Sequence, residues 1–319
     1  MKDSFSRNID YMRISITDRC NMKCPYCRPE DIPFIPHDKI LRYEEILRVC
    51  KIMVAQGIKV IRVTGGEPLL REGCIDFLKS LKSIPQTPRV TLTTNGMLLK
   101  KYIKELHELQ LDGLNVSLDT LSPELYKSMT GVDGLSQVLE AIHQALSLDI
   151  PVKVNCVPVK GLNDQEIIKM ANLARELPID VRFIELMPSS ESSALQGVSS
   201  EEVYEVIAQE YPDLSYDETL RGFGPARYYK SQAMQGSVGV ISAISDSFCS
   251  KCNRLRLTSE GYLKFCLHHD LGIDLREMLR NGESDDVIAQ MIKANIQKKP
   301  EKHLLQEETS LKHMSRIGG

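Results

Sequence analysis

The stretch Cys20-Asn21-Met22-Lys23-Cys24-Pro25-Tyr26-Cys27 places three cysteines within a short segment of the chain. This spacing is too tight for one helix face and suits a loop wrapped around a compact cluster. The group is one thiolate short of a closed tetrahedral site, because structural zinc almost always has four protein ligands. A four-iron cluster held by three cysteines instead keeps one iron open for an added ligand. A zinc half-site remains the alternative for these three cysteines taken alone.

A second group of three cysteines, Cys249, Cys252 and Cys266, lies near the other end of the chain. This group also lacks a fourth thiolate, and it predicts a second cluster with an open iron. A zinc site completed by His268 or His269 is the alternative.

The segment that follows Cys252 reads Asn253-Arg254-Leu255-Arg256-Leu257. In an extended strand, Cys252, Arg254 and Arg256 share one face and the two leucines take the other. Because guanidinium groups match phosphate oxygens in geometry, this face predicts a phosphorylated substrate held between metal and arginine. An arginine considered alone is more commonly a solvated surface cation.

The composition bounds the class of protein. At 319 residues and 42% hydrophobic content, the chain can form one large α/β domain and a smaller appendage. Nine cysteines without a secretory signal favour reduced thiols and a cytoplasmic location. No apolar run approaches the roughly 20 residues of a membrane-spanning helix. A net charge of -3 gives no general case for nucleic-acid binding.

Short β-prone runs alternate with helical patterns along the first part of the chain. Strands are expected at Arg13–Thr17, Val60–Thr64, Arg89–Thr93, Leu114–Leu118, Val152–Val157 and Asp180–Leu186, and the clearest helices at Tyr43–Gln56 and Asp164–Leu177. This alternation predicts parallel strands joined by right-handed crossovers. A first domain is expected over residues 1–200, and a smaller α+β domain over residues 201–319.

Polar and apolar residues alternate within these strands. Arg13, Ser15 and Thr17 share one face of the first strand, whereas Ile14 and Ile16 share the other. Parallel strands covered on both faces are normally continuous apolar runs. We therefore expect a partial barrel with helices outside and a polar interior, although an antiparallel sheet with one solvated face is an alternative.

The run Thr64-Gly65-Gly66-Glu67-Pro68 follows the second expected strand. With the first cysteine group and Tyr26, it resembles the radical S-adenosylmethionine (SAM) superfamily. The resemblance implies that Cys20, Cys24 and Cys27 hold a 4Fe-4S cluster whose open iron chelates SAM. Reduction of that cluster then yields a 5'-deoxyadenosyl radical. The paired glycines are expected to let the backbone approach a ligand closely.

Over essentially the whole chain, the sequence is similar to the GTP 3',8-cyclase family of molybdenum cofactor biosynthesis. The similarity includes the runs Arg13-Ile14-Ser15-Ile16-Thr17-Asp18-Arg19-Cys20-Asn21 and Phe248-Cys249-Ser250-Lys251-Cys252-Asn253-Arg254-Leu255-Arg256. It implies a partial (β/α)6 barrel, a C-terminal domain with a second 4Fe-4S cluster, and conversion of GTP to 3',8-cyclo-7,8-dihydro-GTP, the first step of the pathway.

The resemblance also implies site residues, with no catalytic residue beyond the cluster ligands. The expected GTP contacts are Arg13, Arg62, Thr93, Lys153, Arg254 and Arg256; the expected SAM contacts are Tyr26, Gly66, Ser117 and Met187. Arg182 matches an arginine near SAM or the triphosphate. The expected partners are an electron donor such as a flavodoxin or ferredoxin and the downstream cyclic pyranopterin phosphate synthase, with no nucleic acid and no membrane; a monomer or a homodimer is expected.

Two features of the resemblance concern the details of the site. Many relatives carry a lysine where this chain has Val60, and Lys59 would face the opposite side of the strand. The chain ends in Gly318-Gly319, as the family does, in a tail thought to reach the active site.

The alternative functions are a radical SAM peptide-modifying enzyme with one auxiliary cluster and a zinc-stabilised cysteine-rich protein. Cys50 and Cys156 are expected in the core.

Overall fold

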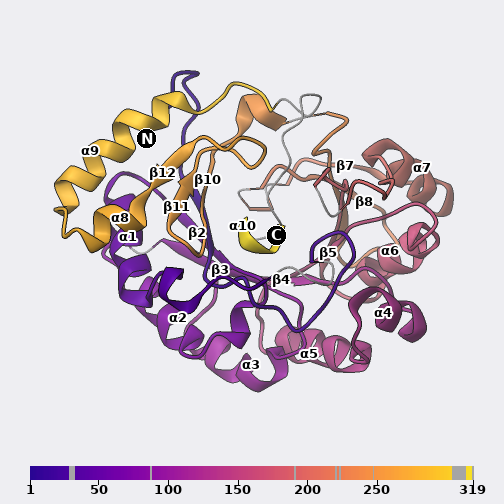
Figure 1. Cartoon of the computed structure of the whole chain (residues 1–319). Helices are drawn as coiled ribbons and strands as arrows, with labels where there is room; N and C mark the ends of the chain where they lie inside the picture. The colour runs from indigo at the N-terminus through magenta and orange to yellow at the C-terminus, as the bar shows by residue number, and fades with distance from the viewer. Residues whose placement is uncertain are drawn as a thin grey trace.

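The computed structural model describes residues 1–28, 33–86, 88–189, 192–219, 221–222, 224–246, 248–303 and 314–317. Within these residues, the strands form one sheet in the order β12-β11-β10-β1-β2-β3-β4-β5-β6-β9-β8-β7. The sheet curves into an open barrel, with helices along its outer face and the short helix α10 (Met314–Ile317) in its hollow (Figure 1). The C-terminal glycines fall outside the described residues.

The barrel proper is built from six strands that pair in parallel in chain order. They are β1 (Tyr11–Ser15), β2 (Val60–Thr64), β3 (Arg89–Thr94), β4 (Gly113–Ser117), β5 (Val152–Cys156) and β6 (Asp180–Ile184). The predicted series of alternating strands and helices is confirmed, and the antiparallel alternative is wrong.

Helices cover the outer face of these strands (Figure 1). They are α1 (Tyr43–Ala55), α2 (Cys74–Lys82), α3 (Leu99–Glu108), α4 (Pro123–Thr130), α5 (Leu135–Ser147) and α6 (Ile167–Glu176), with short 3-10 turns η1 (His37–Lys39), η2 (Pro68–Leu70) and η3 (Asp164–Glu166). The predicted helix from Tyr43 ends at Ala55, close to Gly57, whose φ of +102° suits glycine. The other predicted helix begins with η3 and becomes α-helical at Ile167.

The alternation within strands sorts side chains between the helical layer and the barrel interior. Ile14, Ile61 and Val63 are fully buried in the core between sheet and helices. Arg13 and Arg62, on the opposite face, line an interior cavity. Cys50, Cys74 and Cys156 all belong to the hydrophobic core, as expected for Cys50 and Cys156.

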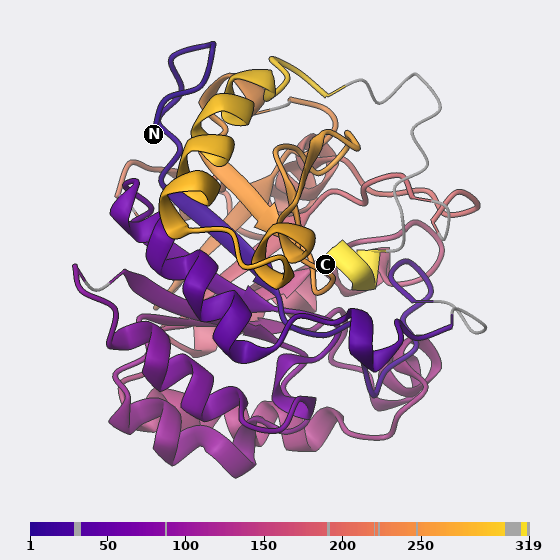
Figure 2. The same cartoon turned by 60° about the vertical axis from the view of Figure 1, so that its left-hand side comes forward.

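The C-terminal part extends the sheet at both ends. Beyond β6 lie α7 (Ser200–Glu210), β7 (Ser215–Asp217), β8 (Arg227–Lys230) and β9 (Ser237–Ile241); beyond β1 lie η4 (Phe248–Lys251), β10 (Arg254–Leu257), β11 (Tyr262–Lys264), β12 (Gly272–Asp274), α8 (Leu275–Arg280), α9 (Asp285–Asn295) and η5 (Ile296–Lys298). Because β10 pairs in parallel with β1, the second cysteine group comes next to the first strand of the barrel. Figure 2 shows α8 and α9 lying over this end of the sheet. Among the described residues, none of the helices has the length and apolar character required to span a bilayer.

Candidate functional site

The first cysteine group lies in a tight loop after β1. The amides of Cys27 and Arg28 both donate to the carbonyl of Cys24, at 3.1 and 2.9 Å. The Cys20 thiol accepts a hydrogen bond from the amide of Met22 at 3.4 Å and one from Asn95 Nδ2 at 3.8 Å. Burial raises the pKa of Cys20, and that of Cys24 more strongly. Thiols held this way need a metal to favour the thiolate form.

The segment Gly65–Glu67 holds this loop through the backbone. The Gly66 amide donates to the carbonyl of Thr17 at 2.7 Å, and the Glu67 amide donates to that of Arg19, also at 2.7 Å. A Cβ on Gly66 would lie 2.3 Å from the Arg19 carbonyl oxygen. One close approach that requires glycine here is made by the chain's own backbone, next to Cys20.

The Glu67 carboxylate joins this segment to the end of β3. It is fully buried and accepts hydrogen bonds from Thr94 Oγ1 at 2.8 Å and from the Asn95 amide at 2.7 Å. Burial raises its pKa to about 7, although these hydrogen bonds favour the charged form.

Tyr26 is anchored by a residue that the sequence reasoning missed. Its hydroxyl donates to the carboxylate of Asp119, whose other oxygen accepts from the Val157 amide at 2.8 Å. Burial raises the pKa of Asp119 to about 6 and that of Tyr26 well above its ordinary value. Asp119 lies two residues after the last residue of β4, and only the position of a polar residue near a strand end could have marked it.

The second cysteine group flanks β10 and β11. The Cys252 amide donates to the Cys249 carbonyl at 3.1 Å, which closes a turn at η4. Burial tends to raise the pKa of Cys252, but the nearby charges of Lys299 and Arg254 outweigh burial and lower it to about 7. This environment favours a thiolate.

Both cysteine groups line one interior cavity of about 310 Å³. Its walls include all six of these cysteines, the residues Tyr26, Gly66, Ser117, Met187 and Arg182, and the residues Arg13, Arg62, Thr93, Arg254 and Arg256. Ile317 in α10 is buried against Cys27, Met187 and Leu267, so the C-terminal segment reaches the space between the two cysteine groups.

Three arginines form a row across adjacent strands of this cavity. Arg13 on β1 is in register with Arg256 on β10 and with Arg62 on β2. Since neighbouring strands lie about 4.8 Å apart, three like charges stand side by side. Burial, followed by the charges of Arg256 and Arg62, lowers the pKa of Arg13, and burial lowers that of Arg256 to about 10. The row needs an anion to relieve this repulsion.

Several polar atoms in the cavity have no partner in the part of the chain that the structure describes. Within those residues, Arg13 Nε, Thr93 Oγ1 and Arg256 Nη1 are buried without a hydrogen bond. Buried donors are normally paired, and those left unpaired mark a place where a ligand completes the site. A polyanion with many acceptor oxygens fits this set of donors.

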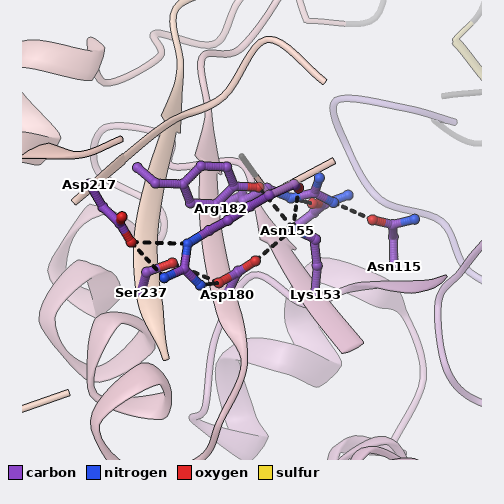
Figure 3. A network of polar contacts seen from close by, with 9 residues as sticks. Asn115, Lys153, Asn155, Asp180, Arg182, Asp217 and Ser237 are labelled. Atoms are coloured by element: carbon purple, nitrogen blue, oxygen red, sulfur yellow. Dashed lines mark hydrogen bonds and ion pairs between the residues drawn. The ribbon is translucent and has the colours of Figure 1, made fainter. Parts of the chain in front are cut away.

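Lys153 lies apart from the cavity that contains the cysteines. It lines a second cavity of about 180 Å³, which shares Tyr11, Arg62 and Arg182 with the first. Its ammonium contacts Asp180 Oδ2 at 2.6 Å, and Arg221 Nη1 contacts the other oxygen of Asp180 at 2.9 Å. Figure 3 shows Lys153 and Asp180 pointing toward each other, with Asp217 and Ser237 beside them.

Arg182 on β6 is held by two asparagines, one on the adjacent strand β5 and one on β4 beyond it (Figure 3). Its Nε donates to Asn155 Oδ1 at 2.9 Å, and its Nη2 donates to Asn115 Oδ1. Val60 is buried in the wall of the second cavity, whereas Lys59 is exposed. The sequence reasoning missed Asp180, a charged residue opening a predicted strand.

Comparisons with known proteins identify the family. The Radical SAM superfamily matches residues 14–174, and Molybdenum Cofactor Synthesis C matches residues 179–305. A GTP 3',8-cyclase of Clostridium perfringens (strain 13 / Type A) is 46% identical over 323 residues, and one of Heliobacterium modesticaldum is 44% identical over 327 residues; both alignments cover 100% of each chain. The chain belongs to the GTP 3',8-cyclase family of the radical SAM superfamily.

A solved structure supports the fold. Streptococcus suis SuiB bound to S-adenosylmethionine superposes with a TM-score of 0.66 at 14% identity, covering 96% of this chain and 76% of that one. As a radical SAM protein, the chain uses SAM and a 4Fe-4S cluster. Among the described residues, no three His, Cys, Asp or Glu side chains converge on a single metal ion. A four-iron cluster spreads its thiolates over a larger space than one ion does.

Proposed function

We propose that this chain converts GTP to 3',8-cyclo-7,8-dihydroguanosine 5'-triphosphate, the first step of molybdenum cofactor biosynthesis. The observation that carries the proposal is the cavity that has both cysteine groups and the row of Arg256, Arg13 and Arg62 in its wall. The identity with the cyclases supports the same substrate. When bound, SAM and the first cluster supply the radical that takes hydrogen from the ribose.

The residues of the chain bind and orient the nucleotide. We propose that Arg13, Arg62, Arg254 and Arg256 grip the phosphates, because four guanidiniums supply the charge and the geometry of donors that a triphosphate needs. Thr93 and Lys153 complete the contacts. A substrate fixed at its phosphates is held with its reacting atoms in one orientation, which supplies much of the rate enhancement.

We propose that Cys20, Cys24 and Cys27 hold the SAM-binding cluster, and that Tyr26, Gly66, Ser117, Met187 and Arg182 contact SAM. These residues line the same cavity as the three cysteines. The Tyr26–Asp119 hydrogen bond orders the loop before any cofactor binds.

We propose a second 4Fe-4S cluster at Cys249, Cys252 and Cys266, with an open iron toward the purine. The basic surroundings of Cys252 and the position of all three cysteines in the cavity wall support it. Anaerobically reconstituted protein should be brown, and Cys252→Ala should lower its iron content by about four per chain. Cys50→Ala, a core cysteine outside both groups, is the control and should leave the iron content unchanged. Equal iron content in the two variants would refute the second cluster.

A peptide-modifying activity is the second candidate from the sequence. The structure of SuiB bound to precursor peptide SuiA has the same fold with a TM-score of 0.64, but at 14% identity this likeness concerns the fold alone. The arginine row favours a nucleotide over a peptide.

The test of the function is deoxyadenosine formation. Reconstituted protein is incubated anaerobically with SAM, a reductant and either GTP, ATP or no nucleotide. GTP should stimulate deoxyadenosine formation well above both controls. If GTP and ATP are equivalent, the substrate assignment fails.

Other expectations stay predictions. They are a division into domains at residues 1–200 and 201–319, an electron donor such as a flavodoxin or ferredoxin, transfer of product to the cyclic pyranopterin phosphate synthase, a monomer or homodimer, and a cytoplasmic location.

A further inference from the structure

A buried lysine in the C-terminal part of the chain lies beside the second cysteine group. Lys299 follows η5 and is 2% exposed. Its ammonium donates to the carbonyl of Arg254 at 3.0 Å and to the carbonyl of Phe265. Arg254 stands two residues after Cys252, and Phe265 directly precedes Cys266. One side chain thus ties together the two segments that carry these cysteines.

Lys299 has no carboxylate partner among the residues that the structure describes; its ammonium donates to the carbonyls of Arg254 and Phe265 and lies within hydrogen-bonding reach of the Cys252 thiol. A buried ammonium is strongly disfavoured unless a negative charge compensates it. Lys299 lines the same cavity wall as Cys252 and Cys266. The source of negative charge that the structure places beside Lys299 is therefore this group of cysteines, as thiolates or as ligands of a cluster.

A second buried cation at this place provides a contrast. Arg7 donates to the carbonyl of Cys249 at 2.8 Å and to that of Pro300 at 2.7 Å. Its charge is already compensated, because its Nε contacts Asp3 Oδ2 at 2.6 Å. Arg7 therefore fixes the backbone around Cys249, while the charge of Lys299 remains for the cysteine group.

We propose that Lys299 is the buried counter-ion of the second cysteine group, and that its charge raises the reduction potential of the cluster bound there. The inference rests on the second cluster proposed above. Adding an electron to a cluster increases its negative charge, and a fixed ammonium in a low-dielectric site stabilises that reduced form. Groups outside the ligand set tune metal sites in this way.

The test isolates the second cluster in the full-length chain. The first cysteine group is removed by Cys20→Ala, Cys24→Ala and Cys27→Ala, so that one cluster contributes to the spectra. The midpoint potential is then measured by redox titration followed by electron paramagnetic resonance, and iron is counted per chain. Lys299→Gln removes the charge but keeps a hydrogen-bond donor, and Lys299→Arg keeps both.

Lys298→Met is the matched control, because Lys298 is the preceding residue and is exposed, with its ammonium on Asn295 Oδ1. We expect Lys299→Gln to shift the potential to more negative values and to retain less iron. Lys299→Arg and Lys298→Met should stay near the parent, since water and salt screen the exposed charge.

Other outcomes overturn the inference. A potential in Lys299→Gln equal to that of Lys298→Met would show that the charge does not act on the cluster. Weaker GTP binding in Lys299→Gln with an unchanged potential would make Lys299 a substrate ligand instead. If the parent with the first cysteine group removed binds no iron, the second cluster itself fails, and the inference fails with it.

Discussion

Gly66→Ala tests whether the segment after β2 is held against the first cysteine loop by close backbone packing. A Cβ at Gly66 would lie 2.3 Å from the Arg19 carbonyl oxygen, 2.6 Å from its carbon and 2.8 Å from the Asp18 carbonyl oxygen. These neighbours are backbone atoms and cannot rotate away. The substitution must therefore displace the backbone that leads into Cys20.

The expected cost follows from this overlap. Overpacking in a well-packed region costs about 1–3 kcal/mol, and contact with backbone belongs at the upper end of that range. The chain offers a graded series. A Cβ at Gly65 would lie 2.8 Å from the Thr17 carbonyl oxygen, whereas a Cβ at Gly224 would meet no atom of the described residues within 4 Å beyond its own chain neighbours. We expect the loss of stability to be greatest for Gly66→Ala, smaller for Gly65→Ala and within about 1 kcal/mol of wild type for Gly224→Ala.

The assay is thermal unfolding of the anaerobically purified protein, followed by circular dichroism, with iron counted in parallel. Roughly 2 °C of melting temperature corresponds to each kcal/mol in a chain of this size. Gly66→Ala should also bind less iron, since the loop carrying Cys20 moves. Equal melting temperatures and iron contents for Gly66→Ala and Gly224→Ala would refute the packing argument.

Arg254→Ala should lower kcat/KM for GTP roughly 10- to 150-fold, which corresponds to the loss of about 1.5–3 kcal/mol for a charged hydrogen bond. Arg42 is exposed, and Arg42→Ala should leave kcat/KM unchanged. An unchanged kcat/KM for Arg254→Ala would remove Arg254 from the site. Arg13→Met should weaken equilibrium GTP binding more than Lys153→Met does, because Asp180 already neutralises Lys153, whereas Arg13 Nε has no partner among the described residues; the reverse order would contradict this reasoning. Burial opposes ionisation of Asp180, but Lys153 outweighs burial and holds the pKa of Asp180 below its ordinary value. The charged Asp180 therefore contributes to stability above pH ~4, and this contribution is lost as the pH falls through the pKa of Asp180 in the folded state. The unfolding free energy of wild type should therefore fall more steeply with acidification than that of Asp180→Asn, and parallel pH profiles would exclude this contribution.

Much of the fold follows from local patterns. The period of two in Arg13–Thr17 and in Arg254–Leu257 predicts which side chains face the interior, and the structure buries Ile14 and Leu255 on the opposite face. Helical spacers then require parallel strands. Expected strand ends differ from the observed ones by about two residues at most, as for β1 at Tyr11–Ser15, because strand ends depend on pairing with neighbours.

Other properties of the site depend on strand order. Arg256 and Arg13 are far apart in sequence, and they become neighbours because β10 pairs with β1 at the edge of the barrel. The same holds for Asp180, which forms an ion pair with Lys153 only because β5 pairs with β6. No local pattern reveals such partners, since an isolated strand does not specify which strand lies beside it.

The sequence alone predicted a cluster at each cysteine group, and it determined the barrel class and the faces of its strands, because these depend on residue type and on spacing along the chain. Only the tertiary structure decided which charges compensate one another. Arg13 Nε and Arg256 Nη1 are buried without a hydrogen bond to the described residues, Lys153 is neutralised, and Lys299 is buried against the second cysteine group. Electrostatic energies depend on distance and burial, and folding sets both.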